Sequence, residues 1–313
     1  MLECASLYAW GPMGHDVVAA IAEQNLTCKA KRKITKLLDG KSIVYYSSWM
    51  DNIQNSPYWR NGYDKTKTWH YANVDEGHTY ETMKKEEKGD VITGLEMLTD
   101  ALTNHYNELT DSMKVDYVKM IIHMVGDMHC PMHAGRLSDR GGNSKKVRWF
   151  GQNTNLHSVF DSKMIESARK WGYMEWVEQL DRKDRKFKKA VTTGTYKEWF
   201  TTTVDNAAAI YNYVEAINSD NPNLSYQFVY DFSPMLEEQL ILGGYRFITG
   251  KDIAMMPDGT PRIATAHMFR FSDSFINEYL PLTIELGRSF VRLEYQSSKA
   301  GAKALYALDN LWD

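Results

Sequence analysis

The sequence predicts an all-α protein whose helices are joined by long loops. Apolar residues recur near the helical spacing of about 3.6 along most of the chain. Only the short stretch KKVRWFG, at 145–151, has the composition of a strand. Gly, Asn, Asp and Pro gather between the periodic segments and indicate loops. These loop stretches are 56–66, 138–144, 219–225 and 256–262.

The expected helices follow from apolar spacing and from residues that cap helix ends. The first covers 14–38. Asp90 or Thr93 is expected to cap a helix that runs to about Leu109, and Asp111 is expected to cap the next. Further helices are expected after Asn155 and over 196–217, 235–247, 273–292 and 299–311.

Composition excludes some classes of function. Hydrophobic residues make up 43% and charged residues 25% of the 313 residues, as in a globular protein. The net charge of -3 gives no basic excess, so a nucleic-acid substrate would have to be gripped locally. No apolar run is long enough for a membrane anchor. The charge cluster KKEEKGD, at 84–90, is interpreted as solvated surface. The oligomeric state does not follow from the sequence.

Three regions are expected along the chain. Residues 1–9, MLECASLYA, are interpreted as the remnant of a signal peptide, with a disordered N-terminus as the alternative. Residues 10–250 form the main body. Residues 251–313 form a helical C-terminal extension of unknown role, and KDIAMMPDGTPR marks the boundary.

The stretch IIHMVGDMHCPMHAG, at 121–135, places titratable groups in what otherwise reads as a buried helix. His123 and Asp127 are four residues apart and therefore lie on one helix face. Such a pair alone could be a satisfied hydrogen bond in the core. Pro131 breaks the helix and lets His133 turn back toward the same region.

A second pair with the same spacing, His157 and Asp161, follows in NLHSVFD. Together with His133, the two pairs give five side chains of the types that zinc accepts, imidazole and carboxylate. Three more candidates lie in turn-rich segments, where each alone could be ordinary polar surface. These are His15 in AWGPMGHD, Asp51 in SSWMD and His70 in TWHYANVD.

These motifs occur here in the order found in the zinc-dependent single-strand nucleases, which share a fold with zinc-dependent phospholipase C. The motifs are W-G-x-x-G-H, W-x-D, W-H-Y, H-x-x-G-D-x-H-x-P-x-H, G-G-N and N-L-H-x-V-x-D. The chain resembles this family from Trp10 to Asp161 and more weakly to EEQLILGGYRFI, at 237–248. The resemblance implies a single multi-helix domain of that type, with long loops around a site for three Zn²⁺ ions.

The resemblance also implies a ligand set. One zinc would be held by Asp51, His70, His123 and Asp127. A second, bridged to the first by Asp127, would take His15 and the α-amine and carbonyl of Trp10. A third would take His133, His157 and Asp161. Because the α-amine of Trp10 is free only if the chain begins there, cleavage after Ala9 is expected to be required.

The implied reaction is attack on phosphorus by a hydroxide that bridges two zincs, with Asp51 and Asp127 as the catalytic carboxylates. The expected enzyme is a secreted or periplasmic hydrolase that cleaves single-stranded RNA and DNA to 5′-phosphate products, with 3′-nucleotidase activity in addition. Two alternatives remain open at this point. One is a zinc-dependent phospholipase C, and the other is a metal-binding protein that has lost catalysis.

The expected substrate contacts depart from the family pattern in two places. Tyr71 follows the zinc-binding histidine, where the family stacks an aromatic ring on a base, although ordinary packing is an alternative. Asn73 stands where the family has Asp. Gln54 stands where the family commonly has a Lys or Arg that contacts phosphate. Asn143 matches the family and is expected to contact or shape the phosphate cleft. Arg60, Arg136 or Arg140 could replace the missing charge.

Two other residues of the histidine-rich stretch are expected to do no chemistry. His129 is interpreted as a packing or supporting residue rather than a ligand. Cys130 is not expected to be a nucleophile, because the flanking histidines are assigned to zinc. Whether Cys28 and Cys130 pair is left open by the sequence.

Overall fold

A computed structural model describes residues 10–54 and 56–247, and these residues are mostly helical. The α-helices are α1 Pro12–Asn25, α2 Cys28–Leu37, α3 Trp49–Ile53, α4 Pro57–Gly62, α5 Val91–Asn104, α6 Asp111–Met128, α7 Leu156–Ser158, α8 Met164–Ala168, α9 Tyr173–Leu180, α10 Arg185–Val191, α11 Tyr196–Ala216 and α12 Tyr226–Arg246. Short 3₁₀ turns are η1 Ile43–Tyr46, η2 Asp64–Thr68, η3 Tyr106–Glu108, η4 Pro131–Ala134 and η5 Leu137–Asp139, and η6 Val159–Lys163 is a π-helical turn. The predicted all-α class is confirmed.

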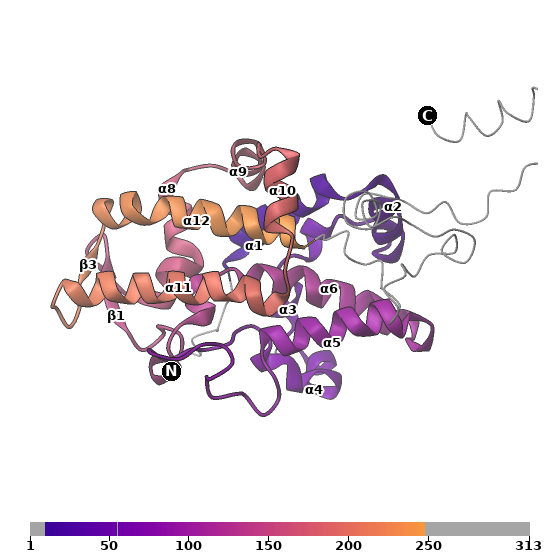
Figure 1. The fold of residues 1–313 in the computed structure, drawn as a ribbon, viewed down its shortest axis with the longest axis horizontal. Helices are drawn as coiled ribbons and strands as arrows, with labels where there is room; N and C mark the ends of the chain where they lie inside the picture. The colour runs from indigo at the N-terminus through magenta and orange to yellow at the C-terminus, as the bar shows by residue number, and fades with distance from the viewer. Residues whose placement is uncertain (1–9, 55, 248–313) are drawn as a thin grey trace, which may run out of the picture. The chain divides into compact units, whose positions relative to one another are not determined.

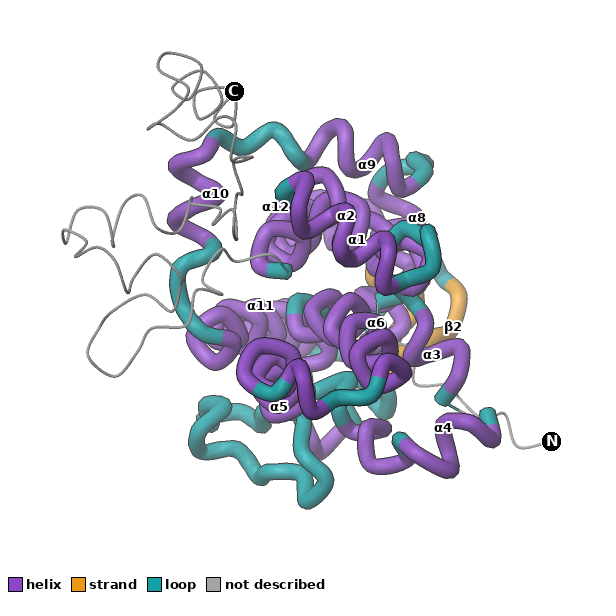
Figure 2. Tube along the Cα trace, turned by 90° about the vertical axis from the view of Figure 1, so that its right-hand side faces the viewer, coloured by secondary structure: helices purple, strands orange, loops and turns teal. Residues whose placement is uncertain are grey.

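The helices pack around α1 and α6. Helix α1 packs against α12, α9 and α6, while α5 lies along α6 and α11 covers η4. Figures 1 and 2 show α11 and α12 running side by side, and the rings of Tyr213 and Phe232 lie 5.2 Å apart between them. Among the described residues, no helix has both the length and the apolar character needed to cross a bilayer.

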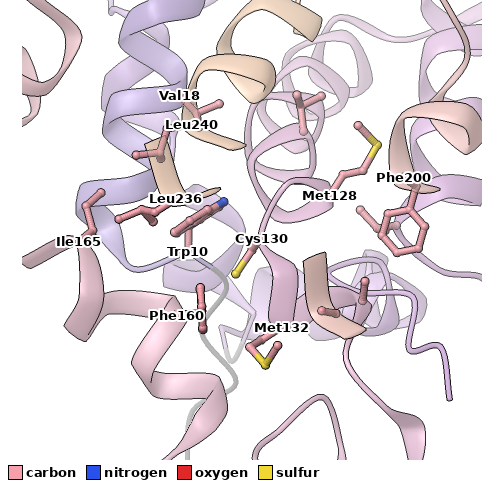
Figure 3. Close-up of a cluster of buried hydrophobic side chains, with 14 of the residues drawn as sticks. Trp10, Val18, Met128, Cys130, Met132, Phe160, Ile165, Phe200, Leu236 and Leu240 are labelled. Atoms are coloured by element: carbon pink, nitrogen blue, oxygen red, sulfur yellow. The ribbon is translucent and has the colours of Figure 1, made fainter. Parts of the chain in front are cut away.

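A buried apolar cluster joins the segments of the chain that carry the candidate site. Figure 3 shows Leu236 of α12, Phe160 of η6 and Cys130 around Trp10, with Met128 of α6 farther away toward Phe200 of α11. Trp10 and Phe160 are completely buried, and so is Cys130. Because interiors pack at the density of organic crystals, these neighbours fix the backbone beneath the site.

A small sheet, with strand order β2–β1–β3, lies at one end of the helices. Its strands are β1 Lys146–Trp149, β2 Gln152–Asn155 and β3 Asn223–Leu224. Strands β1 and β2 are antiparallel, with Lys146 opposite Asn155. The Asn155 side chain then accepts a hydrogen bond from the Ser158 backbone N–H and caps α7. The hairpin therefore delivers the chain to the helical segment that carries His157 and Asp161.

Several predicted boundaries were wrong. The expected helix over 14–38 is two helices, because Thr27 begins a new one by accepting a hydrogen bond from the Ala30 N–H. Asp90 does cap α5, but this helix ends at Asn104. Thr110, one residue before the expected Asp111, caps α6.

Other segments differ in type from the expectation. The stretch 56–66, expected as a loop, is largely helical, since Ser56 caps α4 and Pro57 occupies its first position. Helix α12 begins at Tyr226 rather than 235 and contains Pro234. Because a proline normally marks the start or a break of a helix, the helix was predicted to begin after Pro234, and this prediction was wrong. Strands β2 and β3 and helices α9 and α10 were not predicted. The expectations for residues 1–9 and 251–313 lie outside the described residues.

Asp181, directly after α9, ties together three helices. Its carboxylate accepts hydrogen bonds from Asn25 at the end of α1, Lys188 in α10 and Tyr245 in α12, at 2.8, 2.8 and 2.6 Å. Burial alone would raise the pKa of Asp181, but these hydrogen bonds outweigh burial and lower the pKa below its usual value. The ionised carboxylate therefore contributes to stability.

We expect Asp181→Asn to lower the free energy of unfolding at pH 7 by about 1–3 kcal/mol, because the Lys188 ammonium loses its anionic hydrogen-bond partner. A carboxylate with a lowered folded-state pKa stabilises above its unfolded pKa and loses that effect as the pH falls through the folded pKa. The difference from wild type should therefore shrink below about pH 4. Thermal unfolding from pH 7 to pH 3 measures this, with the exposed Asp220→Asn as control. A difference that is independent of pH would contradict it.

Candidate metal centre and adjoining pocket

His123 and Asp127 lie on one face of α6, as their spacing predicted, and both are fully buried. His123 Nε2 lies 3.1 Å from Asp127 Oδ2. His70, which follows η2, brings its Nδ1 to 3.0 Å from the same oxygen and 3.1 Å from His123 Nε2. Three polar groups from two segments thus converge on one point in the interior.

Asp51 joins this point from α3. Its Oδ1 lies 3.6 Å from His123 Nε2 and 3.7 Å from His70 Nδ1, and the residue is 8% exposed. The segment after His70 is tied to the loop that carries His133, because Ala72 N–H donates to His133 O and Val74 N–H donates to Gly135 O. Backbone pairing therefore holds two loops of the site together.

His15, in the first turns of α1, approaches Asp127 from the other side. Its Nε2 lies 3.3 Å from Asp127 Oδ1, and its ring stacks on His123 at 4.1 Å. A side chain at Gly126 would put its Cβ 2.7 Å from His15 Nδ1, so this close approach requires a glycine. We call His15, Asp51, His70, His123 and Asp127 the main cluster.

Trp10, the remaining candidate of this group, is completely buried just before α1. The next residue, Gly11, donates its backbone N–H to the carbonyl of Asp161. The start of the described chain is thereby fixed against the segment that carries the last expected ligand.

A second group lies nearby. One donor atom each from Cys130, His133 and Asp161 fall within 4.8 Å of one another, and all three residues are buried. His157 lies beside this group, since its ring stacks on that of His133 with centroids 5.2 Å apart. His133 also faces the main cluster, with Nδ1 3.8 Å from Asp127 Oδ1.

Three of the predicted histidine ligands present a ring nitrogen to a backbone carbonyl. The Nδ1 atoms of His123, His133 and His157 lie 2.8, 2.5 and 2.8 Å from the carbonyl oxygens of Ser47, His70 and Gly141. A carbonyl only accepts, so each Nδ1 carries a proton and each Nε2 is the ring nitrogen left for a metal ion. This arrangement orients a histidine for metal binding.

Several buried nitrogen and oxygen atoms of the site have no hydrogen-bond partner. Among the described residues, such atoms concentrate here, although a buried polar atom normally has a partner. They are His15 Nδ1 and Nε2, Asp51 Oδ1, His70 Nε2, Asp127 Oδ1, His133 Nε2 and Asp161 Oδ1. Imidazole nitrogens and carboxylate oxygens are zinc ligands, so the residues present fit a metal ion.

The pKa shifts show the same need for positive charge. Burial opposes ionisation of Asp127, but His123 and His133 beside it lower its pKa well below the usual range. For Asp161, burial together with the charges of Asp51 and Asp127 outweighs the opposing effect of His123 and raises its pKa well above the usual range. Burial lowers the pKa of His133 to about 4, which keeps its ring neutral at pH 7.

A pocket of about 120 Å³ opens beside the second group. Its lining includes three predicted substrate residues, Tyr71, Asn73 and Asn143, together with His157. Its other lining residues are Glu86, Met132, Leu137, Arg140 and Gly141. We call it the Tyr71 pocket. The structure thus brings together an aromatic ring, two amides and one predicted ligand.

The predicted phosphate contacts are placed differently. Gln54 is half-buried at the end of α3 and does not line the Tyr71 pocket. Arg136 pairs with Glu215 and Glu76 and lies over the Tyr211 ring, so its charge is already matched. Arg140 is exposed and lines the pocket. The side chain of Arg60 lies outside the described residues.

Sequence reasoning missed Glu86, which was interpreted as solvated surface within a charge cluster. Glu86 is half-buried in the Tyr71 pocket. Burial of Tyr71, followed by the charge of Glu86, raises the pKa of Tyr71 above the usual value. Nothing in the alternating charges of that stretch distinguishes Glu86 from its neighbours.

His129 uses both ring nitrogens in hydrogen bonds within the core. Its Nδ1–H donates to Val125 O at 2.8 Å, and its Nε2 accepts from Arg246 Nη1 at 3.1 Å. Burial and the Arg246 charge lower the pKa of His129 to about 3. Cys28 is exposed and Cys130 is buried, and the two are not paired.

A buried cluster of imidazole and carboxylate groups, held by helices beside a small polar pocket, defines a helical protein with a candidate metal centre. A family model described as S1/P1 Nuclease matches residues 10–249. The chain therefore belongs to the S1/P1 nuclease family, as its motifs predicted.

Two named nucleases are similar in sequence to most of this chain. Endonuclease 2 of Arabidopsis thaliana is 25% identical over 266 residues, which cover 77% of this chain and 89% of that protein. Nuclease S1 of Aspergillus oryzae is 23% identical over 278 residues, 79% of this chain and 92% of that protein. The expected class, a hydrolase of phosphoester bonds, agrees with these names.

A shorter match has higher identity. A protein of Bacteroides thetaiotaomicron named glycine N(alpha)-acyltransferase is 60% identical over 88 residues, 28% of this chain. The matched residues make up 26% of that protein. The chain thus spans about a quarter of the length of this relative.

Proposed function

We propose that this protein is a zinc-dependent phosphodiesterase that cleaves single-stranded RNA and DNA to 5′-phosphate products and also acts as a 3′-nucleotidase. The observation that carries the proposal is the position of the Tyr71 pocket beside the buried metal-type groups. His157 joins the two, because it lines the pocket and stacks on His133. A base held by Tyr71 would place its phosphate next to the metals.

Three zinc ions are assigned to the site, following the family pattern. The first is assigned to Asp51, His70, His123 and Asp127, and the second to Asp127, His15 and the α-amine and carbonyl of Trp10. The third is assigned to His133, His157 and Asp161. A bridging role for Asp127 is supported by its two oxygens, since Oδ2 faces His70 and His123 while Oδ1 faces His15.

When bound, zinc supplies a water of lowered pKa as nucleophile and positive charge for the phosphate oxygens. The chain's own residues then bind and orient the substrate. Tyr71 offers a ring for base stacking, and Asn73 offers both a donor and an acceptor to the base. Arg140 and Asn143 are assigned to the phosphate, with Gln54 as a neutral amide donor near Asp51.

The pocket also separates this proposal from the alternatives. A phospholipase needs an apolar mouth for acyl chains, whereas the Tyr71 pocket presents Asn73, Arg140 and Asn143. The buried nitrogen and oxygen atoms without hydrogen-bond partners favour a loaded metal site, and the Tyr71 pocket beside them favours a catalyst over a metal-binding protein that has lost catalysis. We further infer a secreted or periplasmic location, because the family assignment and the leader-like residues 1–9 fit an exported enzyme.

We expect the purified, zinc-loaded protein, processed to Trp10, to hydrolyse single-stranded DNA and RNA and not phosphatidylcholine. Asp127→Asn should lower the rate by more than the roughly 10–100-fold typical of losing an outer-shell partner, because the bridge itself is altered. The exposed Asp100→Asn serves as control. Hydrolysis of phosphatidylcholine alone would favour the phospholipase, and three bound zincs without turnover would favour the metal-binding protein that has lost catalysis.

We expect full activity only when Trp10 is the first residue, because its α-amine is a ligand in the proposed set. A chain that keeps residues 1–9 should bind fewer zinc ions by atomic absorption and should be at least roughly tenfold slower. A tag at the C-terminus, with Trp10 free, is the control. N-terminal sequencing that found Met1 intact in fully active native enzyme would refute this assignment.

We expect Tyr71→Ala to weaken single-stranded oligonucleotide binding by about 1–3 kcal/mol, roughly 5–150-fold, because the stacking surface is lost. Tyr71→Phe keeps the ring and should bind almost normally, and Tyr45→Ala at an exposed site controls for unspecific effects. The KM for a short single strand measures the effect. If Tyr71→Ala left KM unchanged, the ring would be a packing residue only.

A further inference from the structure

Cys130 occupies an unusual place between residues assigned to metal. It follows α6 directly, and its N–H donates to Asp127 O at 3.0 Å while its carbonyl accepts from His133 N–H at 3.0 Å. Its side chain is completely buried, and Figure 3 shows it close to Phe160 and Met132. The backbone therefore holds the thiol at a fixed point between two proposed ligands.

The thiol lies with donors that have no partner. Cys130 Sγ groups with one atom each of His133 and Asp161 within 4.8 Å. His133 Nε2 and Asp161 Oδ1 have no hydrogen-bond partner. Water cannot easily reach them either, because the two residues are only 2% and 7% exposed. Two unsatisfied donor atoms beside a sulfur have the composition of a metal site, whereas a sulfur in a purely apolar core would have carbon neighbours.

We propose that Cys130 Sγ is a ligand of the third metal ion, together with His133 and Asp161. This inference rests on the proposed metal site and adds a ligand that the family pattern does not supply. Zinc binds sulfur at about 2.3 Å and nitrogen or oxygen at about 2.0–2.2 Å, so donors on one zinc lie roughly 3.5 Å apart. Donors already within 4.8 Å need only small shifts to share one ion.

The ligand changes the character of that ion. With His157 included, the third ion has four protein donors, whereas zinc in catalytic sites usually has three and an open position. The thiolate of Cys130 and the carboxylate of Asp161 together balance the charge of a divalent ion, and the thiol proton is released to solvent on binding. A soft sulfur donor favours zinc, cobalt or cadmium over magnesium or manganese. The third position should therefore retain its ion most firmly.

Cobalt substitution tests this directly, because a thiolate bound to Co²⁺ gives a near-ultraviolet charge-transfer band that imidazole and carboxylate do not give. The protein processed to Trp10 is loaded with three equivalents of Co²⁺. We expect the band in the wild type and in Cys28→Ser, which keeps Cys130 as the single cysteine of the processed protein. Cys130→Ser should lose the band and should release one ion to a chelator more than about 10–100-fold faster.

The wild-type spectrum decides the matter even if Cys130→Ser does not fold. A cobalt-loaded wild type that cleaves single-stranded DNA without the band would refute the Cys130 ligand and leave the proposed function intact. A band that persists in Cys130→Ser, or that disappears in Cys28→Ser, would also refute it. A chain that binds no metal at all would overturn both the ligand and the proposed function.

Discussion

The structure depends on one buried carboxylate. Asp127 is fully buried, yet histidines face both of its oxygens, and without them or a metal its charge would carry a large desolvation cost. The helices α1 and α6 and the segment after η2 must pack so that His15, His123 and His70 reach it. The close approach at Gly126, the stacking of His15 on His123 and the burial of Trp10 are consequences of that convergence.

A second layer of contacts makes the convergence rigid. The carbonyl groups of Ser47, His70 and Gly141 each accept from a histidine ring, so loop backbone rather than side chains sets ring orientation. Two of these loops also pair with each other through Ala72 and His133. Short turns can therefore hold a site as firmly as long helices do. The positioning of metal and substrate requires such rigidity.

The sequence predicts some of this and not the rest, for physical reasons. The pairing of His123 with Asp127 follows from helix geometry, and the family motifs collect the other candidates. The carbonyl partners leave no trace in residue identity, because every residue has a carbonyl. Glu86 is hidden among like residues in a charge cluster, and the position of Cys130 among unpaired donors depends on packing. The start of α12 was predicted at the wrong residue, because a helix can accommodate one proline in its interior, as α12 does at Pro234.

The hydrogen bond between Gly11 and Asp161 has a consequence for how the protein forms. It joins positions at opposite ends of the segment that carries every proposed ligand, so the chain must close a very long loop before the two meet. Such non-local contacts are entropically costly and are made late in folding. During synthesis, the first proposed ligands leave the ribosome long before Asp161, so the complete ligand set cannot form until Asp161 has been made. The complete site therefore exists only in the folded protein. Ions that bind to it would stabilise the native state relative to the unfolded chain.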